Sequence, residues 1–158
     1  MAQRSLLSTG LSGVAGEYFV AAELSRRGYI ATVTLRNARG VDILAVRDDG
    51  SGRAPVQIQV KTNQGHAKSW VLSKKAEDLQ ADTLFYAFVS LNGLDGAPEY
   101  HIVRSADVAR FCRDSHRAWL ATPGRAGRPH VDNPIRQFQD KPGWFRDRWD
   151  LLDEGDVA

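Results

Sequence analysis

The sequence predicts an α/β fold in which a mixed central β-sheet is flanked by helices. Apolar residues at helical spacing open the chain over residues 12–27, and short segments rich in apolar and β-branched residues follow. A continuous apolar run at 84–91 is typical of a strand in the middle of a sheet. Helices that alternate with strands favour an α/β architecture, and 158 residues correspond to one domain.

The first helix is expected over residues 12–27, with Ser12 as its N-cap. Val14 and Ala21 mark an apolar stripe at helical spacing, and Glu17 falls on the same stripe. An inward carboxylate is unfavourable unless a partner compensates for its lost hydration, so Glu17 is a candidate functional residue. The alternative is that Glu17 pairs with a neighbouring arginine or lies at the edge of the stripe.

Three strands are expected next, over residues 29–35, 41–47 and 56–62. The second, VDILAVR, is nearly all apolar except for Asp42. The third, VQIQVKT, alternates strictly, so that its glutamines and Lys61 lie on one face. The loop between the second and third strands is dense in turn residues, which predicts that they pair as a hairpin.

The later elements are less distinctive. We expect a short strand at 70–72, a helix at 73–81 capped by Ser73, strands at 84–91 and 100–103, and helices at 105–119 and 144–152. A loop at 122–134 separates the last two helices. The chain is therefore predicted to be a single domain, residues 1–158, with a motif core at about 12–103 and a helical extension at about 105–152.

Composition limits the location and the kind of site. The net charge of +2 permits nucleic-acid contact without demanding it. Cys112 is the only cysteine, which excludes an intramolecular disulfide, and the four scattered histidines give no zinc spacing. The sequence has neither a signal-peptide pattern nor an apolar stretch of the ~20 residues that span a membrane. We expect a cytoplasmic protein with no membrane partner.

Four residues indicate a metal-dependent site that cleaves phosphodiesters: Glu17, Asp42, Gln59 and Lys61. Gln59 and Lys61 share a face of one strand, and the hairpin would bring Asp42 to them. Mg²⁺ prefers hard oxygen ligands, which Asp42, Gln59 and the carbonyl of Val60 supply. A nearby lysine can orient the attacking water or stabilise charge in the transition state.

This layout resembles the PD-(D/E)XK nuclease superfamily, which includes restriction enzymes and Holliday-junction resolvases. The segment GEYFVAAELSRRGY is similar to the glutamate-bearing first helix of that family, GVDILAV to its aspartate strand, and IQVKT to its last motif. The match spans roughly residues 12–62. Val41 stands where proline is common, and Gln59 stands where an acidic residue is usual, so this chain is a QxK variant.

The resemblance implies a restriction endonuclease-like fold and a nuclease that acts on DNA with Mg²⁺ or Mn²⁺. Asp42 would be the central metal ligand, and Gln59 and the Val60 carbonyl would complete the protein's share of the shell. Glu17 would hold a water of the ion or position Lys61. Because an amide brings no charge, we expect one weakly bound ion. Many such folds act as dimers, so a homodimer is also expected.

Six basic residues are candidates for nucleic-acid contact: His66, Lys68, Lys74, Lys75, Arg125 and Arg128. The first four follow the last motif, and the others lie in the 122–134 loop. Solvated loops would have a similar composition, so an ordinary surface role is the alternative.

Simpler readings of the motif lead to other functions. In these readings Asp42 serves only a turn, and the polar face of the third strand meets only solvent. One rival function is a catalytically inactive nucleic-acid-binding or assembly module with the same fold. Another is an unrelated α/β domain that binds a protein partner through an exposed apolar patch.

Overall fold

The computed structural model describes residues 7–35 and 40–154. Within these ranges the central sheet has the strand order β1-β2-β3-β5-β6. Its strands are β1 (Tyr29–Val33), β2 (Ile43–Arg47), β3 (Val56–Asn63), β5 (Leu84–Ser90) and β6 (Glu99–Arg104). Strands β3 and β5 are parallel, and the other neighbours are antiparallel, so the predicted mixed sheet is confirmed.

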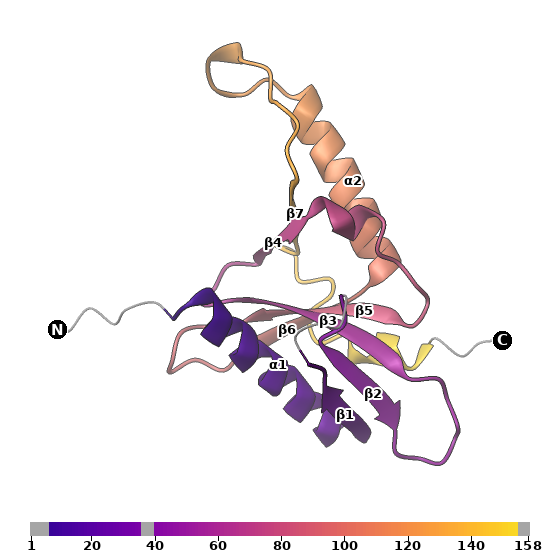
Figure 1. Ribbon diagram of the computed structural model, residues 1–158. Helices are drawn as coiled ribbons and strands as arrows, with labels where there is room; N and C mark the ends of the chain where they lie inside the picture. The colour runs from indigo at the N-terminus through magenta and orange to yellow at the C-terminus, as the bar shows by residue number, and fades with distance from the viewer. Residues whose placement is uncertain (1–6, 36–39, 155–158) are drawn as a thin grey trace.

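Helix α1 (Thr9–Arg26) covers one face of this sheet (Figure 1). It begins one turn earlier than predicted, because the hydroxyl of Ser8, not that of Ser12, accepts the capping hydrogen bond from the Leu11 N–H. The buried side of α1 includes Gly16, where a Cβ atom would lie 1.9 Å from Oγ1 of Thr62 on β3. Glycine therefore permits a close approach of helix and strand.

The central position of β5 agrees with its apolar sequence. All seven of its residues are buried, because β3 and β6 cover its two edges and packed layers cover its two faces. The β2–β3 hairpin also forms as predicted, with Ile43 opposite Ile58. The apolar side chains of β3 face α1, whereas Gln59 and Lys61 face the opposite layer.

That opposite layer consists of helix α2 (Ser105–Ala121) and a small antiparallel sheet of β4 (Ser69–Ser73) and β7 (Ile135–Gln139). A second core lies beneath it, in which the rings of Phe88 and Phe138 stack with centroids 4.4 Å apart. Figure 1 shows α2 rising away from the sheet, with the following loop at its far end. No helix in the described part of the chain has the length and apolarity needed to cross a bilayer.

The helix predicted at 73–81 is wrong. The structure has only the 3₁₀ turn η1 (Lys74–Glu77). Both groups of the hydrogen bond that would continue a helix are taken by tertiary contacts. The carbonyl of Glu77 accepts from Arg113 at 2.6 Å, and the N–H of Ala81 donates to Oγ of Ser105 at 3.0 Å.

The final helix predicted at 144–152 is also wrong, and only the 3₁₀ turn η3 (Trp149–Leu152) forms. The preceding segment pairs with the sheet instead, since the carbonyl of Phe145 accepts from Ile102 and the N–H of Asp147 donates to Tyr100. The expected helical extension thus contains α2, the 3₁₀ turn η2 (Arg125–Gly127) in the loop, and strand β7.

Candidate active site

Asp42 lies at the edge of β3, at the point where β2 begins. Its N–H donates to the carbonyl of Ile58 at 2.9 Å, and its own carbonyl accepts from Thr34 at 2.8 Å. Its carboxylate Oδ2 accepts from the N–H of Val60 at 2.7 Å. The three hydrogen bonds fix the carboxylate on the backbone of the residue between Gln59 and Lys61.

The carbonyl of Val60 points toward the same edge. In a β-strand the N–H and C=O of a residue share an edge, and residues two apart share it as well. Ile58 bonds toward β2, whereas Gln57 bonds toward β5 through the carbonyl of Thr83. The backbone oxygen of Val60 is therefore directed to the side that Asp42 occupies.

Gln59 and Lys61 line a cleft of about 740 Å³ on the α2 side of the sheet. Tyr86, the partner of Gln59 in the parallel register, forms part of the wall. Ser73 and Lys75 approach from β4 and η1. The cleft thus lies between the central sheet and the β4–β7 layer.

The charged and hydrogen-bonding side chains that line the cleft include Lys61, Lys75, Asp78, Gln59 and Tyr86. Burial raises the pKa of Tyr86 to about 12, with a smaller contribution from Cys112 nearby, so the phenol stays protonated at neutral pH. Lys61 is half-buried and has no hydrogen-bond or ion-pair partner among the described residues. Its ammonium group is thus available to an anion in the cleft.

Glu17 approaches from the other layer. It is half-buried on α1, next to Gly16, which touches the end of β3 at Thr62. Phe19 lines a groove with Leu91 on the β5 side of the helix, and Glu17 is two residues before it, on the opposite flank. Glu17 therefore lies on the flank directed toward β2, but it does not line the cleft.

The donor set suits one magnesium-like cation. Asp42 offers a carboxylate whose Oδ1 accepts no hydrogen bond within the described residues. Gln59 and Val60 add an amide oxygen and a carbonyl oxygen, which are also hard ligands. Among residues 7–35 and 40–154, no three His, Cys, Asp or Glu side chains are grouped to hold a metal. The set therefore carries less charge than an all-carboxylate site.

The structure distributes the basic residues proposed to contact nucleic acid over two regions. His66, Lys74 and Lys75 are exposed, and Lys75 borders the cleft. Lys68 differs, because its ammonium group donates to the carboxylate of Glu99 and is already neutralised.

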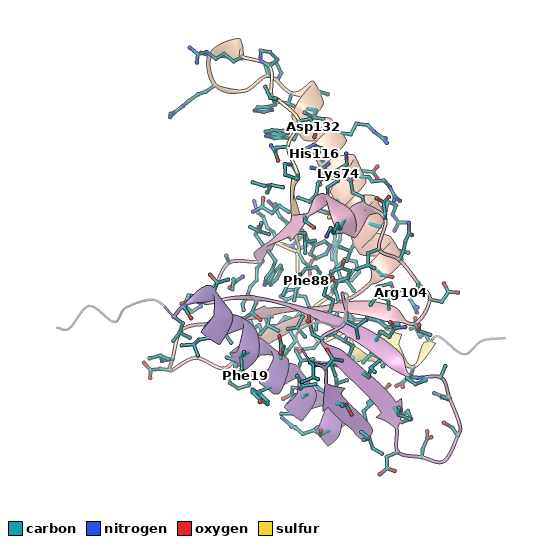
Figure 2. The ribbon with its side chains drawn as sticks, viewed as in Figure 1. Phe19, Lys74, Phe88, Arg104, His116 and Asp132 are labelled. Atoms are coloured by element: carbon teal, nitrogen blue, oxygen red, sulfur yellow. The ribbon has the colours of Figure 1, made fainter. Side chains whose placement is uncertain are left out.

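Arg125 and Arg128 lie far from the cleft, in the loop at the end of α2. Both are exposed. The loop is held to α2 by stacking of Trp119 on His130, with ring centroids 4.0 Å apart. Figure 2 shows His116 and Asp132 side by side in this arm, where they form a 2.8 Å contact.

Two parts of the site region were not predicted from the sequence. Tyr86 enters the cleft through the parallel β3–β5 register, which local patterns do not specify. Strand β7 lies just after the loop expected at 122–134, in a segment to which the sequence assigned no element, although Ile135, Gln137 and Gln139 alternate with inward residues. That alternation was the available signal, and it was obscured by a charged inward residue, Arg136.

Two solved structures are similar to this chain in fold. The structure of a bacterial homing endonuclease, I-Ssp6803I, matches with a TM-score of 0.53 over 95% of each chain, at 16% sequence identity. The fold is restriction endonuclease-like. The Holliday junction resolvase Hjc from Archaeoglobus fulgidus matches over 81% of this chain and 84% of its own, with a TM-score of 0.42 and 14% identity. No family model and no curated protein matches the sequence.

At these identities the comparison concerns the architecture alone. The placement of Asp42 beside β3 and of Gln59 and Lys61 on one face comes from this chain's own contacts. The roles of these residues remain predictions.

Proposed function

We propose that the protein is a metal-dependent endonuclease that cleaves DNA. One observation carries the proposal: the Asp42 carboxylate is fixed 2.7 Å from the N–H of Val60, and the residues on either side of Val60 line one cleft. This arrangement gathers an acid, an amide and an unpaired lysine at one sheet edge. These groups are what cation-assisted hydrolysis of a phosphodiester requires.

Gln59 and Lys61 line the cleft, Asp42 and Val60 lie at the adjoining strand edge, and the residues would act as follows. Asp42, Gln59 and the Val60 carbonyl would hold a divalent cation, which supplies charge neutralisation for the phosphate and lowers the pKa of a water. Lys61 would stabilise the charge that grows on the phosphate oxygens as the water oxygen bonds to phosphorus and the leaving oxygen departs. Glu17 would position a water or Lys61 from the α1 side.

DNA is the expected substrate because exposed lysines lie at one side of the cleft. Lys75 borders it, and Lys74 is adjacent in η1. Both occupy the part of the surface that a phosphate backbone would follow on leaving the cleft. A homodimer, in which two clefts face two strands, belongs to the same proposal.

The second candidate function is a binding module that does not cleave. The neutral Gln59 and the lack of a three-residue acidic or histidine group in the described ranges favour it. It predicts DNA binding that needs neither a metal ion nor Asp42.

The decisive experiment compares wild type with Lys61→Met on supercoiled, linear and four-way-junction DNA, with Mg²⁺, Mn²⁺ or EDTA. Methionine keeps the length of the side chain and removes its charge. We expect wild type to cleave in a metal-dependent manner and Lys61→Met to be slower by about 100-fold or more. Lys141→Ala, at an exposed lysine that does not line the cleft, is the matched control and should cleave normally.

Equal rates for wild type and Lys61→Met would assign the activity to another site or to a contaminant. Titration calorimetry with Mg²⁺ separates the two candidate functions. Absence of heat, together with DNA affinity that survives Asp42→Asn, would support the binding module and reject the nuclease.

A further inference from the structure

The β4–β7 sheet presents an outward surface that the cleavage site does not use. We call this surface the ribbon face; its members are Val71, Ser73, Ile135, Gln137 and Gln139. Val71 lies opposite Gln137, and Ser73 opposite Ile135, so these side chains project together. Val71 and Ile135 are 67% and 60% exposed.

The other face of the same sheet is fully committed to the core. Trp70 and Phe138 are opposite one another and are 2% and 1% exposed. The indole N–H of Trp70 donates to the carbonyl of Val89 at 2.9 Å, which ties β4 to the central sheet. Arg136, also inward, is paired with Glu77. The ribbon face is therefore held rigidly on a packed support.

A hydrogen bond between Gln137 and Gln139 orients the amide groups of the ribbon face. Nε2 of Gln139 donates to Oε1 of Gln137 at 2.9 Å. This bond orients both amides, and it leaves the Gln137 nitrogen and the Gln139 oxygen without protein partners in the described part of the chain. The free Gln137 nitrogen can donate to N7 of an adenine, and the free Gln139 oxygen can accept from an N6–H₂ group, which are the groups that adenine presents in the major groove.

The apolar members and the dimensions fit the same partner. The methyl groups of Val71 and Ile135 can contact the C5-methyl group of thymine. The major groove is about 12 Å wide and admits a two-stranded ribbon. Strands of five residues extend ~17 Å, which corresponds to roughly five base pairs.

Charge lies beside the ribbon face and not on it, and it includes the carboxylate of Asp132, which contacts His116 and lies near Lys74. The members of the ribbon face are uncharged, whereas exposed Lys74 and Lys75 follow β4 directly, and Figure 2 shows Lys74 beside α2 at this end of the ribbon. Uncharged hydrogen-bonding groups suit base edges, and bordering cations suit phosphates.

The ribbon face is continuous with the cleft. Ser73 belongs to the ribbon face and also lines the cleft with Gln59 and Lys61. A duplex whose phosphodiester enters the cleft would therefore pass the Ser73 end of the ribbon. We infer that the β4–β7 ribbon enters the major groove of duplex DNA and reads a short base sequence through Gln137, Gln139 and the neighbouring methyl groups. This inference rests on the proposed action of the cleft on DNA.

Selection from a pool of duplexes with a randomised central segment tests the inference, using the full chain in EDTA so that no cleavage occurs. We expect wild type to enrich a shared motif of about five base pairs. Gln137→Ala, at an exposed position, should reduce discrimination at one or two of those positions by about tenfold. The slope of log affinity against log salt should stay unchanged.

The matched control is Lys74→Ala combined with Lys75→Ala. It should lower affinity for all sequences and reduce the salt slope by about one to two, with the motif unchanged. The inference is overturned if wild type enriches no motif, or if Gln137→Ala and Gln139→Ala enrich the same motif as wild type. It is also overturned if Val71→Asp converts a dimer into monomers while the motif persists.

The outcome is separable from that of the nuclease proposal. Binding to a shared motif without Lys61-dependent cleavage would reject the nuclease proposal and support the inference that the ribbon reads base sequence. Lys61-dependent cleavage of all sequences, with no enriched motif, would support the nuclease proposal and reject the inference that the ribbon reads base sequence.

Discussion

The carboxylate of Asp42 caps the backbone N–H of Val60, 2.7 Å away, at the point where the β2–β3 ladder ends. The contact satisfies a strand N–H that would otherwise have no partner strand. It also places a negative charge on the residue between Gln59 and Lys61. The Asp42 side chain thus stabilises the fold and, in our proposal, also binds the cation.

Substitution of Asp42 separates these two roles. Asn keeps an oxygen that can accept from Val60, so Asp42→Asn should change the free energy of unfolding by less than about 1 kcal/mol. Asp42→Ala leaves the N–H unsatisfied and should destabilise by about 1–3 kcal/mol. Both variants should lose Mg²⁺-dependent cleavage. Urea unfolding and cleavage assays on the same preparations measure the two effects.

A result in which Asp42→Asn cleaves at the wild-type rate would remove the carboxylate from the proposed cation site. Circular dichroism of each variant provides the control for folding.

Gln59→Glu should strengthen cation binding. The substitution restores a carboxylate beside Asp42 without changing the length of the side chain, and affinity for divalent ions rises with ligand charge. We expect the Mg²⁺ dissociation constant to fall by about tenfold or more, measured by titration calorimetry. Gln57→Glu, on the same strand face but hydrogen-bonded to Thr83, is the control and should bind Mg²⁺ as wild type does.

If both glutamate variants bind equally, the gain reflects general charge and not a ligand at position 59.

Gly16 sets the distance between α1 and the sheet. Gly16→Ala would place a methyl group 1.9 Å from Oγ1 of Thr62, so the helix must shift. We expect a loss of about 1–3 kcal/mol in the free energy of unfolding, measured in urea. Gly13→Ala, on the same helix with nothing within 4 Å of the new Cβ, should instead stabilise by about 0.5–1 kcal/mol.

A double-mutant cycle locates the clash. Oγ1 of Thr62 is buried and has no hydrogen-bond partner among the residues that the structure describes, so Thr62→Ala should be mild alone and should relieve part of the Gly16→Ala loss. Strict additivity of the two changes would contradict the proposed contact.

The features predicted correctly from the sequence are those that depend on neighbouring residues. Alternation over β3 placed Gln59 and Lys61 on one face, and the turn-rich loop predicted the hairpin that brings Asp42 to Val60. The apolar run of β5 indicated its central position, because a strand covered on both faces needs no polar side.

The errors arise where distant groups capture backbone hydrogen bonds. Arg113 takes the carbonyl of Glu77 and ends the helix expected at 73–81. Asp140 accepts from the N–H groups of Trp144 and Phe145, which holds that segment out of a helix. Local sequence patterns do not predict such partners, because Arg113 and Glu77 lie 36 residues apart in the chain.

The Lys68–Glu99 pair predicts a specific acid dependence of stability. The hydrogen bond from Lys68 lowers the pKa of Glu99 below its ordinary value of 4.5, against the opposing effect of burial. The two side chains are only 26% and 21% exposed, so the pair is partly shielded from solvent. In the unfolded chain Glu99 binds a proton at higher pH than in the folded chain. The contribution of Glu99 to the stability of the fold is therefore fully present above pH 4.5. It is lost as the pH falls through the lowered pKa of Glu99 in the folded protein.

Glu99→Gln should accordingly flatten the dependence of unfolding free energy on pH below 4.5, while it lowers stability at neutral pH by about 1 kcal/mol. Urea unfolding at several pH values measures both effects. Lys68→Met should flatten the same pH region, since it removes the donor, and the double variant should add little to the effect of either single variant.

Because Glu99 already neutralises Lys68, Lys68→Met should also weaken DNA binding less than Lys75→Ala does. A salt slope that falls as much for Lys68→Met as for Lys75→Ala would show that the ion pair opens when DNA binds.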